Sequence, residues 1–298
     1  MQIRNLIFGS LLAISVIAPT WSRADETRLF ADSTLVTQDR FSDEIVGSGP
    51  DLVFIPGLAS SRATWKATAE RLKAHYRLHL IQVAGFAGEP VRGNAAGEVL
   101  VPTAEAIDAY LVAQHLTPAT LIGHSLGGTM LLYLAEHHGD HLKKILVVDA
   151  LPFYAVLMGG PMATADSMKP MADKIRASTD RPPNMDKMIA SLVTAPADRA
   201  MVGAWGVASD HGAVNRALGD DLTLDLRPGL AAIAVPITLL YPDNAPAGAP
   251  AGAMDGAYQA AFAAAPHKTL VRIDNSLHFI MLDQPAQFDA ALDAFLKS

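Results

Sequence analysis

The chain has 298 residues, contains no cysteine and carries a formal net charge of −7 at pH 7. Half of its residues are hydrophobic, so it can bury a large core, and this composition excludes an intrinsically disordered protein. The lack of cysteine excludes disulfides, zinc–thiolate sites and a cysteine nucleophile. An acidic chain binds polyanions poorly, so we do not expect a nucleic-acid partner.

The N-terminal segment, residues 1–24, has the pattern of a secretory signal peptide. Arg4 supplies a positive charge, residues 6–17 form an apolar run, and Ser22-Arg23-Ala24 places small residues where a signal peptidase cleaves. The apolar run is shorter than the roughly 20 residues of a membrane-spanning helix, and no later stretch is long and apolar enough. We therefore expect cleavage after Ala24 and a periplasmic or secreted domain of residues 25–298 with no stable membrane span.

From Asp51 onward, short apolar runs alternate with amphipathic segments of helix length, the pattern of parallel strands joined by crossover helices. This pattern predicts an α/β fold with a doubly wound, mostly parallel sheet. Strands are expected at residues 51–55, 77–83, 119–122, 144–148, 237–241 and 269–273, and helices at residues 62–74, 103–115, 126–138, 254–264 and 285–297.

The alternation stops between Pro152 and about Asp225, where no strand-like run occurs. We interpret this segment, about residues 152–225, as an inserted helical cap. It contains seven of the eleven methionines of the chain. Flexible thioether side chains suit an adaptable substrate-facing surface as well as the core of the cap itself, and the sequence leaves both roles open.

The strongest chemical motif is Gly123-His124-Ser125-Leu126-Gly127-Gly128, which directly follows a predicted strand and directly precedes a predicted helix. A serine on such a sharp turn projects above the sheet, and the glycines avoid a clash where the chain turns back on itself. Ser125 is therefore the candidate nucleophile.

A serine hydroxyl needs a base to take its proton, and the expected place for that base is the loop after the last strand. His278 lies in such a loop, between the predicted strand at residues 269–273 and the final helix. The base needs a carboxylate to orient it. Asp243, after the strand at residues 237–241, is the preferred candidate. Asp149, after the strand at residues 144–148, is the alternative, and Asp255 is a remote third.

Two backbone amides are expected to stabilise the oxyanion that forms during attack on a carbonyl group. One belongs to Leu126, the residue after the nucleophile, and the other to Leu58 in the turn Pro56-Gly57-Leu58-Ala59 after the first predicted parallel strand. Gly57 allows the backbone to approach the nucleophile closely.

A cluster of His137, His138 and His141 follows the predicted helix at residues 126–138. Histidines are favoured at the C-terminus of a helix by the helix dipole, and they also bind metal ions. We favour the first interpretation, so no metal and no cofactor are expected for the function.

Together these motifs resemble the α/β-hydrolase superfamily, and in particular its capped, esterase- and lipase-like serine hydrolases. The resemblance runs from about Phe41 to the C-terminus. It rests on Pro56-Gly57-Leu58, the turn from Gly123 to Gly128, Asp225-Leu226-Arg227 ahead of Val235-Pro236, and His278-Phe279-Ile280-Met281 before Asp283-Gln284-Pro285. The order nucleophile, acid and histidine, usual in this family, is reproduced by Ser125, Asp243 and His278.

The chain departs from the family pattern at two places. The oxyanion turn begins with Pro56 where many relatives have a histidine, and the acid loop reads Tyr-Pro-Asp-Asn where many have Gly-x-x-Asp. The first departure is tolerable because the donor is a backbone amide. The second departure lies at Asp243 itself, so the family pattern does not support this residue as it supports Ser125 and His278.

The sequence thus predicts a serine hydrolase that cleaves a carboxylic ester of a hydrophobic small molecule through an acyl-enzyme. A lactone substrate or carbon–carbon bond hydrolysis on the same scaffold is an alternative, because one fold hosts many reactions. A non-catalytic binding protein is disfavoured, since both Ser125 and His278 are present. The expected partner is therefore a small-molecule ester or lactone.

Overall fold

The structure is a computed structural model that describes residues 28–298 except for residues 182–184. The predicted signal segment, residues 1–24, lies outside the described residues. None of the helices in the described part of the chain has the length and apolar character needed to cross a membrane.

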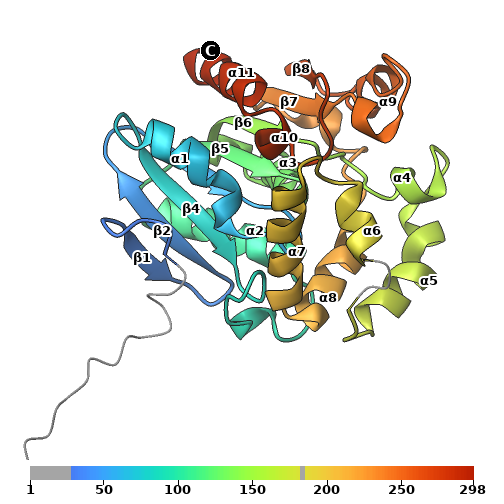
Figure 1. The fold of residues 1–298 in the computed structure, drawn as a ribbon, viewed down its shortest axis with the longest axis horizontal. Coiled ribbons are helices and arrows are strands. Elements are labelled where there is room, and N and C mark those ends of the chain that lie inside the picture. Colours follow the sequence, from blue (N-terminus) through green and yellow to red (C-terminus); the bar gives the residue numbers. More distant parts are fainter. Residues whose placement is uncertain (1–27, 182–184) are drawn as a thin grey trace, which may run out of the picture.

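A sheet of eight strands forms the centre of the described chain, in the order β1-β2-β4-β3-β5-β6-β7-β8 (Figure 1). The first two strands are antiparallel to their neighbours, and all the pairings from β4 through β8 are parallel. The strands are β1 (Thr34–Thr37), β2 (Phe41–Gly47), β3 (Asp51–Ile55), β4 (Arg77–Val83), β5 (Ala119–His124), β6 (Leu142–Val148), β7 (Ile237–Pro242) and β8 (Lys268–Ile273). All six predicted strands are present, to within two residues at each end.

β1 and β2 are not among the strands predicted from the sequence. In β2 the consecutive residues Ser42, Asp43 and Glu44 are all buried, which hides the alternation of apolar and polar residues expected of a strand. Glu44 accepts hydrogen bonds from the amides of Leu29 and Phe30, so this strand fixes the start of the described chain.

The main helices of the sheet layers are α1 (Lys66–Leu72), α2 (Leu100–Ala113), α3 (Leu126–His137), α9 (Asp255–Ala261), α10 (Ile280–Asp283) and α11 (Pro285–Lys297). Short 3₁₀ turns join them at Arg62–Trp65, Arg92–Asn94, Gly139–His141, Leu230–Ala232 and Ala245–Ala247. The five predicted helices correspond to α1 with the turn before it, α2, α3, α9 and α11.

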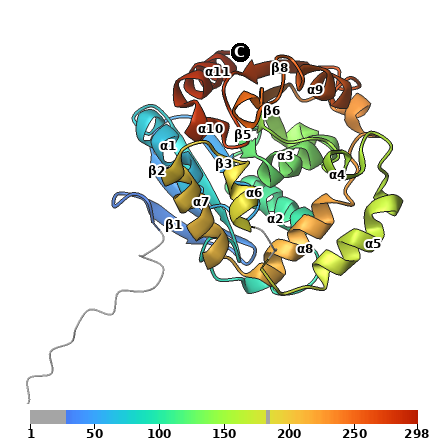
Figure 2. The same cartoon turned by 45° about the vertical axis from the view of Figure 1, so that its right-hand side comes forward.

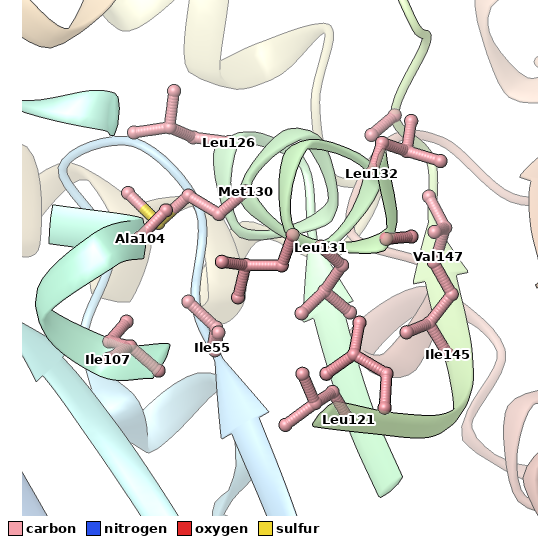
Figure 3. Close-up of a cluster of buried hydrophobic side chains, with 14 of the residues drawn as sticks. Ile55, Ala104, Ile107, Leu121, Leu126, Met130, Leu131, Leu132, Ile145 and Val147 are labelled. Atoms are coloured by element: carbon pink, nitrogen blue, oxygen red, sulfur yellow. The ribbon is translucent and has the colours of Figure 1, made fainter. Parts of the chain in front are cut away.

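Each central strand sends alternate side chains into two separate cores, as a strand with a period of two requires. In β3, Val53 and Ile55 enter one core, whereas Leu52 and Phe54 enter the other. Figure 3 shows the first core, in which Leu131 of α3 lies among buried side chains of the neighbouring strands. Because both faces of the sheet are covered, the predicted doubly wound, mostly parallel architecture is confirmed.

Between β6 and β7 the described chain is helical, as the predicted cap requires. The helices are α4 (Val156–Gly159), α5 (Ala165–Arg176), α6 (Met185–Ala190), α7 (Pro196–Ala208) and α8 (His211–Asp221). In Figure 1, α4 and α5 lie at the right of the view, on the side away from β1, whereas α7 lies near its middle. The cap has a small core of its own, formed by Phe153, Ala155, Ala163, Met168, Ala172 and Leu222.

The methionines of the cap differ in burial. Met168 is 7% exposed within the cap core, whereas Met158 and Met162 are 53% and 88% exposed. The first therefore stabilises the cap, and the other two form part of its surface.

Candidate active site

Ser125 lies on the turn between β5 and α3, with φ 53° and ψ −123°. This left-handed region is strained for a serine, and such strain is typical of a residue held for function. Close packing enforces the turn: a Cβ atom on Gly127 would lie 2.4 Å from the carbonyl oxygen of Ile55. The amide of Ser125 donates to the carbonyl of Val148 at 2.9 Å, which joins the turn to the end of β6.

His278 lies in the loop between β8 and α10, where its ring is partly buried. Its Nδ1 atom lies 2.6 Å from Oδ2 of Asp149, and the two side chains are 23% and 10% exposed. With Nδ1 donating to a carboxylate, Nε2 is the nitrogen that remains to accept a proton in the neutral ring. The structure therefore pairs His278 with the alternative acid.

Asp149 directly follows β6 and has a φ of 49°, so its backbone turns sharply at the end of the strand. Its amide donates to the carbonyl of Leu240 at 2.8 Å. The other carboxylate oxygen, Oδ1, accepts a hydrogen bond from the hydroxyl of Tyr258 in α9. Burial raises the pKa of Tyr258 well above its usual value, and the charge of Asp149 adds to this, so the phenol remains a donor.

The expected pairing of Asp243 with His278 is corrected by the structure. Asp243 accepts backbone hydrogen bonds from Ala245 at 3.0 Å, Asn275 at 3.0 Å and Ser276 at 3.3 Å. Burial raises the pKa of Asp243, but these amides outweigh burial and hold it below its usual value. Asp243 thus shapes the loop that carries His278, and its carboxylate oxygens are already used by backbone amides.

Asp255, the remote third candidate, also lies elsewhere. It accepts a hydrogen bond from the hydroxyl of Tyr241 at 3.0 Å and pairs with Arg272 at 3.0 Å. Tyr241 in turn stacks on Tyr258, with ring centroids 4.6 Å apart. These aromatic rings connect Asp255 to Asp149.

The turn after β3 lies directly against the nucleophile, as the predicted oxyanion role requires. A Cβ atom on Gly57 would lie only 2.9 Å from the Cβ of Ser125. Ser60 donates two hydrogen bonds to this turn, each 3.2 Å long. Its amide donates to the carbonyl of Gly57, and its hydroxyl donates to the carbonyl of Leu58. These bonds keep the turn compact. Leu126 is the first residue of α3, and the amides of a first helical turn have no partner within the helix.

His124, inside the serine turn, is a part of the site to which the sequence assigned no role. Its Nε2 donates to the backbone carbonyl of His278 at 3.1 Å, and its ring lies between those of Trp65, Phe279 and His278. Burial, and then the nearby charge of His278, lower the pKa of His124 well below its usual value. A neutral His124 therefore supports the loop of His278, a role that was not predicted from the sequence.

The cap is connected to the same loop. The amide of Phe279 donates to the carbonyl of Leu192 at 3.0 Å, and Asp283 accepts from both the amide and the hydroxyl of Thr194, at 2.8 and 2.7 Å. The segment between α6 and α7 is therefore held beside the candidate base.

Comparison with known proteins places this arrangement in a family. A sequence model described as the Alpha/beta hydrolase family matches residues 52–291. A hydrolase from Pseudomonas aeruginosa PA01 superimposes with a TM-score of 0.71 at 17% identity, covering 90% of this chain and 99% of that one. At this identity the likeness shows the fold alone.

Two relatives are named as pimeloyl-[acyl-carrier protein] methyl ester esterases. The protein from Vibrio vulnificus (strain YJ016) is 34% identical over 109 residues, which are 37% of this chain and 40% of the relative. The chain therefore matches less than half the length of this relative. The protein from Nitrosomonas europaea is 26% identical over 84% of this chain and 97% of its own length. Since the family model spans most of the chain, including Ser125 and His278, this protein is a member of the alpha/beta hydrolase family.

Proposed function

We propose that the protein hydrolyses a carboxylic ester through an acyl-enzyme, with Ser125 as nucleophile, His278 as general base and Asp149 as the orienting acid. The Ser125 oxygen attacks the ester carbonyl carbon while His278 Nε2 takes its proton. His278 then gives this proton to the alcohol as the carbon–oxygen bond breaks. Water attacks the acyl group by the same route, which releases the acid and restores Ser125. The amides of Leu58 and Leu126 stabilise each oxyanion.

The contact between His278 and Asp149 is the observation that carries this proposal. Its 2.6 Å length fixes which ring nitrogen bears the hydrogen, and both residues lie on loops that flank the Ser125 turn. An oriented histidine within reach activates an otherwise weak serine nucleophile, and the loop of His278 is hydrogen-bonded to the strained Ser125 turn through His124.

The substrate class is inferred from the relatives and from the cap. Relatives named as methyl ester esterases favour an ester, and the methionine-rich cap favours a hydrophobic acyl or alcohol group. A lactone is a cyclic ester and would react by the same steps. We further propose that the cap, about residues 152–225, selects the substrate, because it is hydrogen-bonded to the loop of His278.

Labelling with a fluorophosphonate and turnover of p-nitrophenyl esters test the proposal, with a lactone panel run beside them. The wild type should label rapidly and release p-nitrophenol, whereas Ser125→Ala should do neither and should keep the wild-type melting temperature. Turnover by Ser125→Ala above a few per cent would contradict the nucleophile. An unlabelled wild type that turns over nothing would instead favour a non-catalytic binding protein.

Substitutions on the cap surface test its role in selection. Met158→Ser and Met162→Ser should change the ranking of esters that differ in acyl length, with little effect on stability, because both side chains are exposed. If the substitutions changed the turnover of every ester by the same factor, the cap would have only a structural role.

We also propose that the protein is exported and cleaved after Ala24, on the sequence pattern of residues 1–24. Mass spectrometry of the protein from its native host should find Asp25 as the first residue. Soluble cytoplasmic protein that retains Met1 would contradict export.

A further inference from the structure

The histidine cluster identified in the sequence gains an acidic member in the folded chain. Asp108 of α2 faces His138, which follows α3, and His141, which ends the short turn Gly139–His141. One ligand-type atom from each of the three residues lies within 4.8 Å of the other two. The cluster lies at the far end of α3 from Ser125, about 18 Å away along a helix of this length, so it is separate from the candidate active site.

The distances suit a tetrahedral metal ion. Asp108 Oδ1 lies 2.9 Å from Nδ1 of His141, and Asp108 Oδ2 lies 3.7 Å from Nδ1 of His138. Zinc bonds to nitrogen and oxygen are about 2.0–2.1 Å long, so two ligand atoms on one tetrahedral ion lie roughly 3.3–3.4 Å apart. The two observed distances bracket this value, and the ligand atoms of all three residues lie within 4.8 Å of one another, so rotations of the side chains would bring them around one ion.

The contacts of the distal ring nitrogen of His138 also match those of a metal-binding histidine. Nε2 of His138 lies 3.0 and 3.1 Å from the two carboxylate oxygens of Glu105, and Glu105 accepts from the hydroxyl of Tyr133 at 2.6 Å. A carboxylate that accepts from the distal ring nitrogen fixes the tautomer and raises the basicity of the other nitrogen. In the neutral ring, Nδ1 of His138 then has a lone pair that faces the Asp108 oxygen, and a cation between them would satisfy both.

Burial fits a site that is formed by the protein and open to solvent on one side. The side chain of Asp108 is 7% exposed, whereas those of His138 and His141 are 27% and 32% exposed. The two rings are nearly parallel, at 10°, with centroids 5.8 Å apart. Three protein ligands would leave a fourth position for water.

We propose that Asp108, His138 and His141 bind a first-row divalent transition-metal ion, with Zn²⁺ as the representative, oriented by Glu105. Two imidazoles and one carboxylate favour Zn²⁺ over the oxygen-preferring Ca²⁺ and Mg²⁺. The ion would join α2 to the end of α3 and to the turn before β6. Its effect is on stability, and the ester chemistry proposed above does not use it.

Titration of tag-free protein with ZnCl₂, by calorimetry and by thermal unfolding, tests the site. The wild type should bind one equivalent and melt at a higher temperature with Zn²⁺, whereas CaCl₂ should produce no shift. Asp108→Asn, which keeps the shape of the side chain, and the double variant His138→Ala/His141→Ala should each weaken binding at least tenfold and abolish the shift.

His137→Ala is the matched control. His137 belongs to the same cluster in the sequence, but its Nδ1 contacts the carbonyl of Tyr133 at 2.9 Å, and it is not part of the group of three. This variant should bind Zn²⁺ as the wild type does. Equal Zn²⁺ binding by the wild type and the double variant, or none by the wild type, would overturn the proposal.

Cobalt gives a readout that does not depend on any variant folding. Co²⁺ bound in a tetrahedral nitrogen–oxygen site gives intense visible absorption bands, so the wild type titrated with CoCl₂ should develop them and lose them on addition of Zn²⁺. A wild-type spectrum identical to that of Co²⁺ in buffer would also overturn the proposal.

Discussion

The hydroxyl of Tyr258 donates a hydrogen bond to Asp149, the carboxylate that holds the ring of His278 through its other oxygen. Tyr258 is 4% exposed and projects from α9, so the candidate acid is held from a helix that no sequence motif connects to the active site. It acts as a positioning residue, because it reaches the reaction only through Asp149 and His278.

Tyr258→Phe should lower kcat about tenfold with little change in KM, because a carboxylate hydrogen bond is lost while ground-state binding is untouched. Without this donor the carboxylate of Asp149 is held less firmly against His278, so the loss falls on the chemical step. Steady-state turnover of a p-nitrophenyl ester measures both constants.

Tyr241→Phe is the matched control for this change. It removes a hydroxyl from the other ring of the stacked pair, and that hydroxyl bonds to Asp255. Its kcat and KM should match those of the wild type. Equal kcat values for all three proteins would show that Tyr258 has only a packing role.

Asp221 in α8 is a buried carboxyl group that should make the stability of the fold depend on pH. Burial raises the pKa of Asp221 to about 7, repulsion from Asp220 adds to this, and the hydroxyl of Thr129 opposes it. Because the folded-state pKa lies above the unfolded value of 3.8, ionisation destabilises the fold progressively as pH rises from about 4 to 7. Asp221→Asn removes this cost.

The free energy of unfolding of Asp221→Asn, relative to the wild type, should therefore rise by on the order of 2–3 kcal/mol between pH 5 and pH 8. Urea denaturation at the two pH values measures it. Asp166→Asn, an exposed substitution in α5, should show no such trend. A difference between Asp221→Asn and the wild type that is independent of pH would contradict the buried, protonated carboxyl.

The methionines of the cap should differ in their contribution to stability. Met168→Ala removes a side chain buried beside Phe153 and Leu222, which should cost about 2–4 kcal/mol in the free energy of unfolding. Met162→Ala changes an exposed side chain and should stay within about 0.5 kcal/mol. Urea denaturation measures both variants, and equal losses in the free energy of unfolding would contradict this prediction.

Much of the fold could be predicted from the sequence because the parallel strands are buried on both faces and are separated by helices of clear periodicity. β2 was not predicted because its buried residues include Asp43 and Glu44, whose hydrogen-bond partners are distant in the sequence. Hydrogen bonds between such residues become visible only in the folded chain.

The candidate site, too, could be predicted only in part from the sequence. Ser125 and His278 follow from local context, a glycine-rich turn and a loop after the last strand. The acid does not, because Asp149 and Asp243 both follow parallel strands and only the path of each loop decides which one reaches the histidine. Tyr258 has no local signature at all.

The most direct test of the account is the turnover of Asp149→Asn measured beside that of Asp243→Asn. Asp149→Asn should lower kcat on an activated ester by about 10⁴-fold, because the amide no longer fixes the histidine tautomer or stabilises the imidazolium. Asp243→Asn should lose about tenfold or less, together with some stability, because its carboxylate holds only the backbone of the His278 loop. With both variants shown to fold by circular dichroism, a near-normal Asp149→Asn beside a crippled Asp243→Asn would contradict the assignment of the acid.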